Sequence, residues 1–461
     1  MSGLSVAHRV ALAAMIEQAS DATLVKLSSA AATIPGERSL ELGAMLADES
    51  LDRARRRRVL APLAPMFRPR ADGIEAMTFP AAVLPRLWKA ASSREPALLP
   101  RLDQDDPDAV AVSDRICLAA AAAVRDRPER VWPPDLTPDR RERGLADLAA
   151  CLDLAHLARR GLPSIEVWLK RPDGDQLAEL RLLIKDCADV HVDGAQRVLE
   201  ILFSHLDDAV LILRIITQSS SASGREGFLN ASELAGFVER LIAGVDTRVA
   251  RIGAFRPGSD LANVDAVIDD LTWCANVLGE LDVTLTLNPL SVWGKSVRDA
   301  RVSIAGQLSA FLRAADRAVD KALPLERVQT AGRMTRMTPR LDAPVQGETV
   351  QAVRHLLKLV GAVRGPASTF GAEADRHRLV ESLTDRLGDY ADQALHAVND
   401  GEAEDPVNAL RLVELAARCL DLIAARDAAR TVRRRAAVAG GGQRPVETLV
   451  AGRLIGYIAG P

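Results

Sequence analysis

Apolar side chains recur along most of this chain at intervals of three and four residues. In the segment 296–323, one side carries the apolar residues Val297, Ile304, Leu308, Phe311, Ala315 and Val319. The same spacing continues through residues 379–398 and 410–420. An α-helix with 3.6 residues per turn gathers such positions on one face, which is shielded from water only when another element packs on it. The pattern therefore predicts helices that pack on helices.

The composition supports this fold class. Hydrophobic residues make up 48% of the chain but aromatic residues only 3%, so the apolar content is mostly Ala, Leu and Val. Ala and Leu favour helices, and the small Ala side chain allows helices to approach closely. Runs of alternating polarity rich in Val, Thr, Ile and Tyr, which are typical of strands, are nearly absent. We therefore predict an all-α fold.

The first hundred residues carry frequent helix breakers, beginning with Pro35-Gly36, so helices here are expected to be short. The segments 21–32, 38–46 and 50–60 are each about long enough for one arm of a helical hairpin. Stacked pairs of this kind would form an α-solenoid-like region over residues 1–130. The sequence shows no fixed repeat period, so this prediction depends on helix lengths alone.

Beyond the Pro- and Asp-rich segment 127–139 the apolar patterns lengthen. Residues 137–435 are therefore predicted to form a bundle or rod of longer antiparallel amphipathic helices. The polar stretch 218–230 and the aperiodic stretch 324–346 are candidate subdivisions of this region. Residues 436–461 are predicted to be a Gly-rich linker and a short C-terminal segment.

Charge and cysteine content indicate which ligands and which cellular compartment the chain suits. The net charge of -3 does not make the whole chain attractive to nucleic acid or to an anionic membrane. The five cysteines lack paired spacing, which is typical of reduced core thiols in a cytoplasmic protein. No stretch approaches the roughly 18 uncharged apolar residues that a membrane span needs. We therefore expect a soluble cytoplasmic protein.

One segment resembles part of a phosphate-binding loop. Gly294-Lys295-Ser296 follows a short run typical of a strand and begins a helix. A phosphate-cradling loop also needs a glycine five positions before this one, where Pro289 stands. We favour an ordinary helix start with Ser291 or Ser296 near the cap.

Three residues offer ligands for a soft metal ion. Cys187 and His191 are four residues apart, and His205 follows. On a continuous helix His205 lies too far along the axis to share one coordination sphere, although a break near residues 193–194 would change this. All three residues also fall on the apolar stripe, so buried core residues are the favoured interpretation.

A second pair has the spacing of half a carboxylate-bundle metal site. Asp153 and His156 are three residues apart, but the chain contains no second copy of this motif. No catalytic constellation converges in the sequence, and no cofactor or metal is predicted.

The densest charge run is a candidate basic interaction patch. It comprises Arg53, Arg55, Arg56, Arg57 and Arg58. Such a patch could bind phosphate or an acidic partner; the alternative is a solvated helix whose arginine stems pack over apolar surface. The few aromatic residues argue against single-stranded nucleic acid as the ligand.

These observations favour a non-enzymatic helical scaffold or adaptor that binds a protein partner through helical grooves. Two alternatives stay open. One is an enzyme or small-ligand-binding protein whose site assembles from distant helices, around Cys187 and His191 or around Asp153 and His156. The other is a nucleic-acid-binding regulator that uses the arginine run. The partner is not identified by the sequence, and a homo-oligomer is compatible with the pattern.

Overall fold

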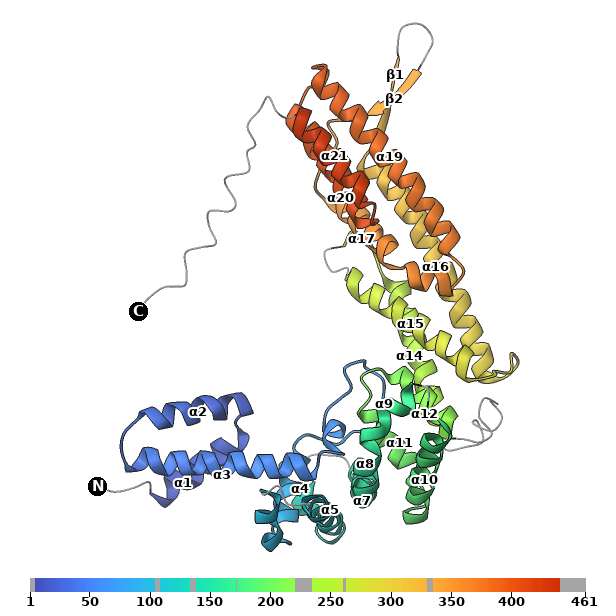
Figure 1. The fold of residues 1–461 in the computed structure, drawn as a ribbon. Coiled ribbons are helices and arrows are strands. Elements are labelled where there is room, and N and C mark those ends of the chain that lie inside the picture. The colour runs from blue at the N-terminus through green and yellow to red at the C-terminus, as the bar shows by residue number, and fades with distance from the viewer. Residues whose placement is uncertain are drawn as a thin grey trace. The chain divides into compact units, whose positions relative to one another are not determined.

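The all-α prediction is confirmed: the chain is 78% helical, with 20 α-helices and almost no strand in the part that is described (Figure 1). The computed structural model describes residues 5–103, 108–132, 138–170, 172–219, 234–259, 263–329 and 335–439. The predicted linker and C-terminal segment lie outside these residues from 440 onward, as does most of the predicted loop 218–230. None of the described helices is both long and apolar enough to cross a membrane.

The chain divides into two compact units, Met1–Arg240 and Leu241–Pro461. The Pro- and Asp-rich segment 127–139 falls inside the first unit. The finer domain limits at 130 and 435 remain predictions.

The first unit is built mainly from short and medium helices. Its α-helices are α1 (Val6–Gln18), α2 (Asp21–Thr33), α3 (Glu37–Val59), α4 (Val83–Ser92), α5 (Ala109–Asp126), α6 (Pro128–Val131), α7 (Pro138–Asp153), α8 (Ala155–Gly161), α9 (Ile165–Leu169), α10 (Gly174–Val190), α11 (Gly194–Ser204) and α12 (Ile212–Ser219). Short 3-10 helices lie between them: η1 (Ala64–Phe67), η2 (Pro96–Leu102), η3 (Leu162–Ser164) and η4 (Ala209–Leu211). Helix α14 (Ala235–Ala254) contains the point of division between the units.

Helix α3 corrects one sequence-based prediction. The segments 38–46 and 50–60 were expected to be separate hairpin arms, but they form one helix of 23 residues. The intervening residues Ala-Asp-Glu at 47–49 include no breaker, so the helix continues through them. Helices α1 and α2 meet α3 around a small core of Ile16, Leu24, Ala31 and Leu46. The solenoid-like arrangement itself is not confirmed.

Helix α4 has one buried face and one exposed face. Its inner side buries Val83, Leu87 and Trp88, and the indole Nε1 of Trp88 donates a hydrogen bond to Asp52 of α3 at 2.7 Å. Helices α5 and α6 also pack against α4. The outward side of α4 is therefore held in a fixed position.

The second unit is a bundle of longer helices. It contains α15 (Val264–Thr284), α16 (Val292–Ala322), α17 (Glu348–Ala362), α18 (Arg364–Thr369), α19 (Glu373–Asn399), α20 (Pro406–Leu422) and α21 (Arg426–Ala439), with strands β1 (Leu325–Gln329) and β2 (Thr335–Pro339). Helix α16 packs against α17 and α19, and α20 packs against α17, α19 and α21. Figure 1 shows α16, α19, α20 and α21 lying lengthwise beside one another.

The long amphipathic helices agree with the periodic pattern. Every residue of the predicted apolar face of α16 is buried. Helix α19 ends at Asn399, and Gly401 has a φ of 71°, the left-handed conformation typical of a helix stop. The aperiodic stretch 324–346 contains an antiparallel hairpin in which Leu325 pairs with Pro339.

Candidate functional site

The Gly-Lys-Ser segment forms the start of α16. The Ser291 hydroxyl accepts a hydrogen bond from the Gly294 N–H at 2.9 Å and thereby caps the helix. A Cβ atom at Gly294 would lie 2.0 Å from the carbonyl oxygen of Asn288, so this position requires glycine for packing. The short run before it that is typical of a strand, residues 283–287, does not form a strand, because its first two residues end α15. The segment has the geometry of a capped helix start, as favoured from the sequence.

The predicted soft-metal ligands do not share a continuous helix. Helix α10 ends before His191, and α11 begins at Gly194. Burial raises the pKa of the Cys187 thiol to about 12. The Nε2 atom of His205 lies 2.8 Å from the Pro62 carbonyl oxygen, and burial lowers the pKa of this histidine. Nowhere in the described residues do three or more His, Cys, Asp or Glu side chains gather in a way that could hold a metal ion.

Asp153 and His156 are both engaged by neighbouring groups of the first unit. Arg125 forms an ion pair with the Asp153 carboxylate. The Nδ1 atom of His156 lies 2.9 Å from the carbonyl oxygen of Asp153. The His156 ring thus contacts the main chain of Asp153, while the Asp153 carboxylate is paired with Arg125, so the two side chains do not face one common metal position.

Arg53, from the predicted basic patch, is an internal clamp. Its side chain is only 7% exposed and bonds Glu49 through Nε and Asp21 through Nη1, both at 2.7 Å. Its Nη2 atom donates to the carbonyl oxygens of Ile16 at 3.0 Å and Glu17 at 3.1 Å. Arg53 thus joins α3 to the end of α1 and the start of α2.

The other four arginines differ in their surroundings. Arg55 donates to the Asp103 carboxylate, with one bond of 2.7 Å, and Arg58 donates to the carbonyl oxygen of Leu102 at 2.7 Å. Burial, and secondly the charge of Arg53, lower the pKa of Arg56. Arg57 is exposed and lies 3.4 Å from Asp21. An external ligand for the run Arg53–Arg58 remains a prediction.

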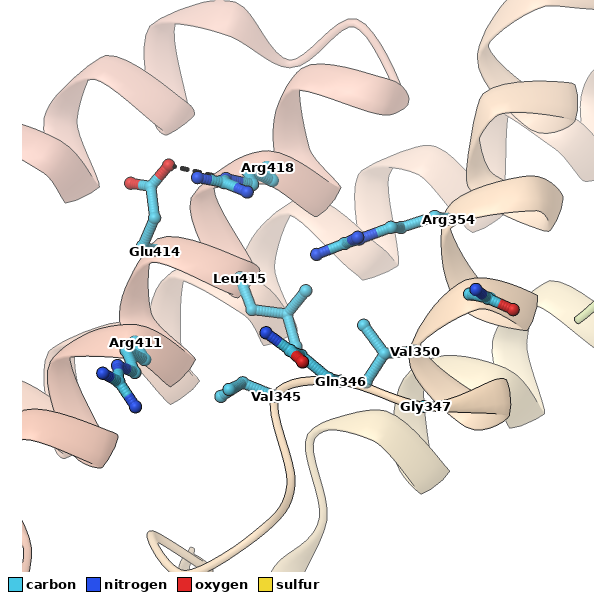
Figure 2. Close-up of a pocket in the computed structure, with 10 residues that line it drawn as sticks. Val345, Gln346, Gly347, Val350, Arg354, Arg411, Glu414, Leu415 and Arg418 are labelled. Carbon is cyan, nitrogen blue, oxygen red and sulfur yellow. Dashed lines mark hydrogen bonds and ion pairs between the residues drawn. The ribbon is translucent and has the colours of Figure 1, made fainter. Parts of the chain in front are cut away.

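A groove that the sequence analysis did not single out lies between α17 and α20. Its first pocket has a volume of about 550 Å³ (Figure 2). The residues that line this pocket are Val345, Gln346, Gly347, Val350, Gln351, Arg354, Arg411, Glu414, Leu415 and Arg418. A second pocket of about 760 Å³ adjoins it, because both share Gln351, Arg354 and Arg418. We refer to the two together as the α17–α20 groove.

The groove follows both helices in the same direction. On α17 its lining runs from the cap residue Gly347 to Lys358, and on α20 from Arg411 to Leu422. Each span covers about 16 Å at a rise of 1.5 Å per residue. The groove therefore has the length of about five residues of extended chain.

Most charged groups in the groove are already paired. Glu414 accepts from Arg418 at 2.9 Å and from Arg433 at 3.3 Å. Asp421 pairs with Arg433 at 2.6 Å, and Asp265 with Lys358 at 2.7 Å. The acidic residues that line the groove are thus neutralised by other cations.

Arg354 is different. Among the described residues it has no ion pair or hydrogen bond through its side chain, although it is half-buried. Figure 2 shows it reaching from α17 toward α20, on the side of Leu415. Burial raises the pKa of nearby Cys419 to about 12, and the positive charge of Arg354 opposes that rise. The groove therefore holds a fixed positive charge beside an apolar floor.

The first pocket also lies at a helix N-terminus. Gly347 precedes α17 with a φ of 110°, and no side chain caps the helix. The uncapped first turn presents a partial positive charge and free N–H donors. Together with Arg354 and exposed Arg411, this end of the groove favours a negatively charged ligand.

The sequence shows only a faint signal for this groove, since Arg354, His355 and Lys358 look like the ordinary polar positions of an amphipathic helix. Comparison with known proteins adds no assignment: no family model, no curated protein and no solved structure matches the chain.

Proposed function

We propose that this protein is a helical scaffold or adaptor, and that its second unit binds an acidic, extended segment of a partner protein in the α17–α20 groove. The observation that carries the proposal is Arg354, a half-buried residue whose side chain has no partner among the described residues and which lies where the two pockets join. Its desolvation is unfavourable until an anion pairs with it.

The shape and lining of the groove support a peptide as the ligand. An elongated channel of about 16 Å matches an extended segment better than a compact metabolite. Val350 and Leu415 offer apolar contacts, while Gln346 and Gln351 offer amide groups that can pair with a peptide backbone. Acidic side chains would alternate with apolar ones along such a segment.

The cysteines support a cytoplasmic site of action as part of this proposal. All five thiols are buried and separate. Unpaired core thiols are typical of proteins in a reducing compartment.

The test uses a fluorescein-labelled eight-residue peptide of alternating Glu and Leu, with a Lys-Leu peptide of equal length as the probe control. Fluorescence anisotropy with the full chain should show binding of the acidic peptide only. Arg354→Gln should weaken it by about tenfold or more, because a charge-assisted hydrogen bond is lost.

Arg434→Gln is the matched variant, since Arg434 is an exposed arginine on α21 that does not line the groove. Equal affinities of the two variants, or binding of both peptides alike, would overturn the proposal. If free glutamate competes as well as the peptide does, the small-ligand alternative replaces it.

A further inference from the structure

A second cationic feature lies on the first unit, where α4, α5 and α6 meet. A pocket of about 470 Å³ is lined there by Arg86, Lys89, Arg94, Arg127 and Arg130. Its remaining lining residues are Ala90, Ser93 and Ala123. Five positive side chains thus surround a space whose lining, in the described residues, includes no carboxylate.

Among the described residues, internal pairing neutralises only one of these cations. Arg94 forms an ion pair with Asp126 at 2.6 Å. Within the described part of the chain, the side chains of Arg86, Lys89, Arg127 and Arg130 have no hydrogen bond or ion pair. This differs from the run Arg53–Arg58, in which Arg53, Arg55 and Arg58 bond to groups of the same unit.

The negative ends of two helix dipoles offset part of this positive charge but not all of it. Helix α4 ends at Ser92 and α5 ends at Asp126, so both C-termini lie beside the pocket. Each carries roughly half a negative charge, and the two together offset about one cation. A surplus of about three positive charges therefore remains over the four unpaired side chains.

The pocket is also supported from behind. The inner face of α4 is buried, and the bond from Trp88 to Asp52 holds the helix against α3. Ala90 and Ala123 leave room between the long cationic side chains. The charges therefore surround an accessible space on a fixed backbone, which is the arrangement that an anion site needs.

We infer that this pocket binds a compact ligand carrying two or more clustered phosphate groups. Several phosphates match the surplus charge, whereas a single carboxylate would leave most of it unpaired. The planar guanidinium of arginine suits the bidentate recognition of phosphate oxygens. None of the described residues that line the pocket is aromatic, so no base could stack on them and a phosphate cluster fits better than a single strand.

Isothermal titration of the full chain with inorganic tripolyphosphate tests this inference. Binding should weaken as salt rises, because exposed cations are screened. The double variant Arg86→Gln/Arg130→Gln should weaken binding by about a hundredfold, at about tenfold for each charged contact. The matched control Arg181→Gln/Lys185→Gln removes the same charge from exposed positions on α10 and should leave binding unchanged.

A second arm uses vesicles with and without a phosphoinositide, since a lipid headgroup offers the same phosphate cluster. Vesicle binding that the pocket variant abolishes identifies the headgroup as the source, and tripolyphosphate binding without it identifies a free ligand. No binding of either probe, or equal losses in both double variants, would overturn the inference. So would binding of a 20-nucleotide single strand that tripolyphosphate does not displace.

Discussion

The most informative single substitution is Arg53→Met. Methionine keeps the apolar stem packed but removes four hydrogen bonds, two to carboxylates and two to backbone carbonyls. If Arg53 is the internal clamp described above, helices α1 and α2 should open from α3 more readily. If it serves mainly as part of an external basic patch, their stability should hardly change.

The structure sets the size of the effect. Breaking a fully buried ion pair costs about 3–5 kcal/mol, but the Asp21 side chain is 61% exposed, so solvent screens its share to below about 1 kcal/mol. Glu49 is 19% exposed and contributes more. The two carbonyl oxygens each lose a charged donor, at about 1 kcal/mol apiece. We therefore expect the opening free energy of α1 and α2 to fall by about 2–4 kcal/mol.

Hydrogen exchange read by mass spectrometry measures this opening region by region, which suits a chain of two units better than a single unfolding midpoint. Peptides from α1 and α2 should exchange roughly 30-fold faster or more in the variant. Arg57→Met is the control on the same helix: its side chain is 66% exposed, and it should change the opening free energy by less than about 0.5 kcal/mol. Equal exchange in the two variants would refute the clamp.

Three further predictions test other parts of the structure. Gly361→Ala should destabilise the second unit by about 1–3 kcal/mol in thermal or denaturant unfolding, because a Cβ there would lie 2.0 Å from the Leu422 carbonyl oxygen; Gly388→Ala, with open space around it, should be neutral or stabilising. Burial raises the pKa of all five thiols, so a thiol reagent at pH 8 should modify none in the folded protein and all five in denaturant; rapid labelling of the native chain would contradict this. The hydrogen bond from Arg376 lowers the pKa of Glu373 below 4.5, so the pair stabilises the fold above that pH and the contribution is lost as the pH falls through the lowered value. The melting temperatures of wild type and Glu373→Gln should accordingly converge in acid, and a constant difference across the pH range would exclude this linkage.

The features that the sequence predicted well are those with a local, periodic signal. The apolar stripe of α16 repeats along the sequence, and every residue predicted to lie on it is buried. The hairpin of β1 and β2 escaped prediction because β1 is exposed along its whole length and therefore shows no alternation of polarity. Helix α3 was divided in two because its apolar pattern weakens near residue 48, although no residue there stops a helix.

The candidate sites escaped prediction for a different physical reason. The sequence shows where charged residues are dense, but it does not show which of them are paired in the fold. A cation can bind a ligand only if packing leaves it without an internal partner. Arg53 lies in the densest run, yet three of its four bonds reach groups 32 to 37 residues away, which come close only when α1 and α2 fold back on α3. Arg354 shares its face of α17 with Gln351 and Lys358 and gives almost no signal, but among the described residues α20 brings it no free carboxylate. We therefore expect unpaired charge in the folded chain to be a better guide to binding than charge density in the sequence. Giving Arg354 an internal partner tests that principle. Leu415→Glu places a carboxylate on the groove floor beside Arg354. It should abolish acidic-peptide binding while leaving tripolyphosphate binding by the first unit intact.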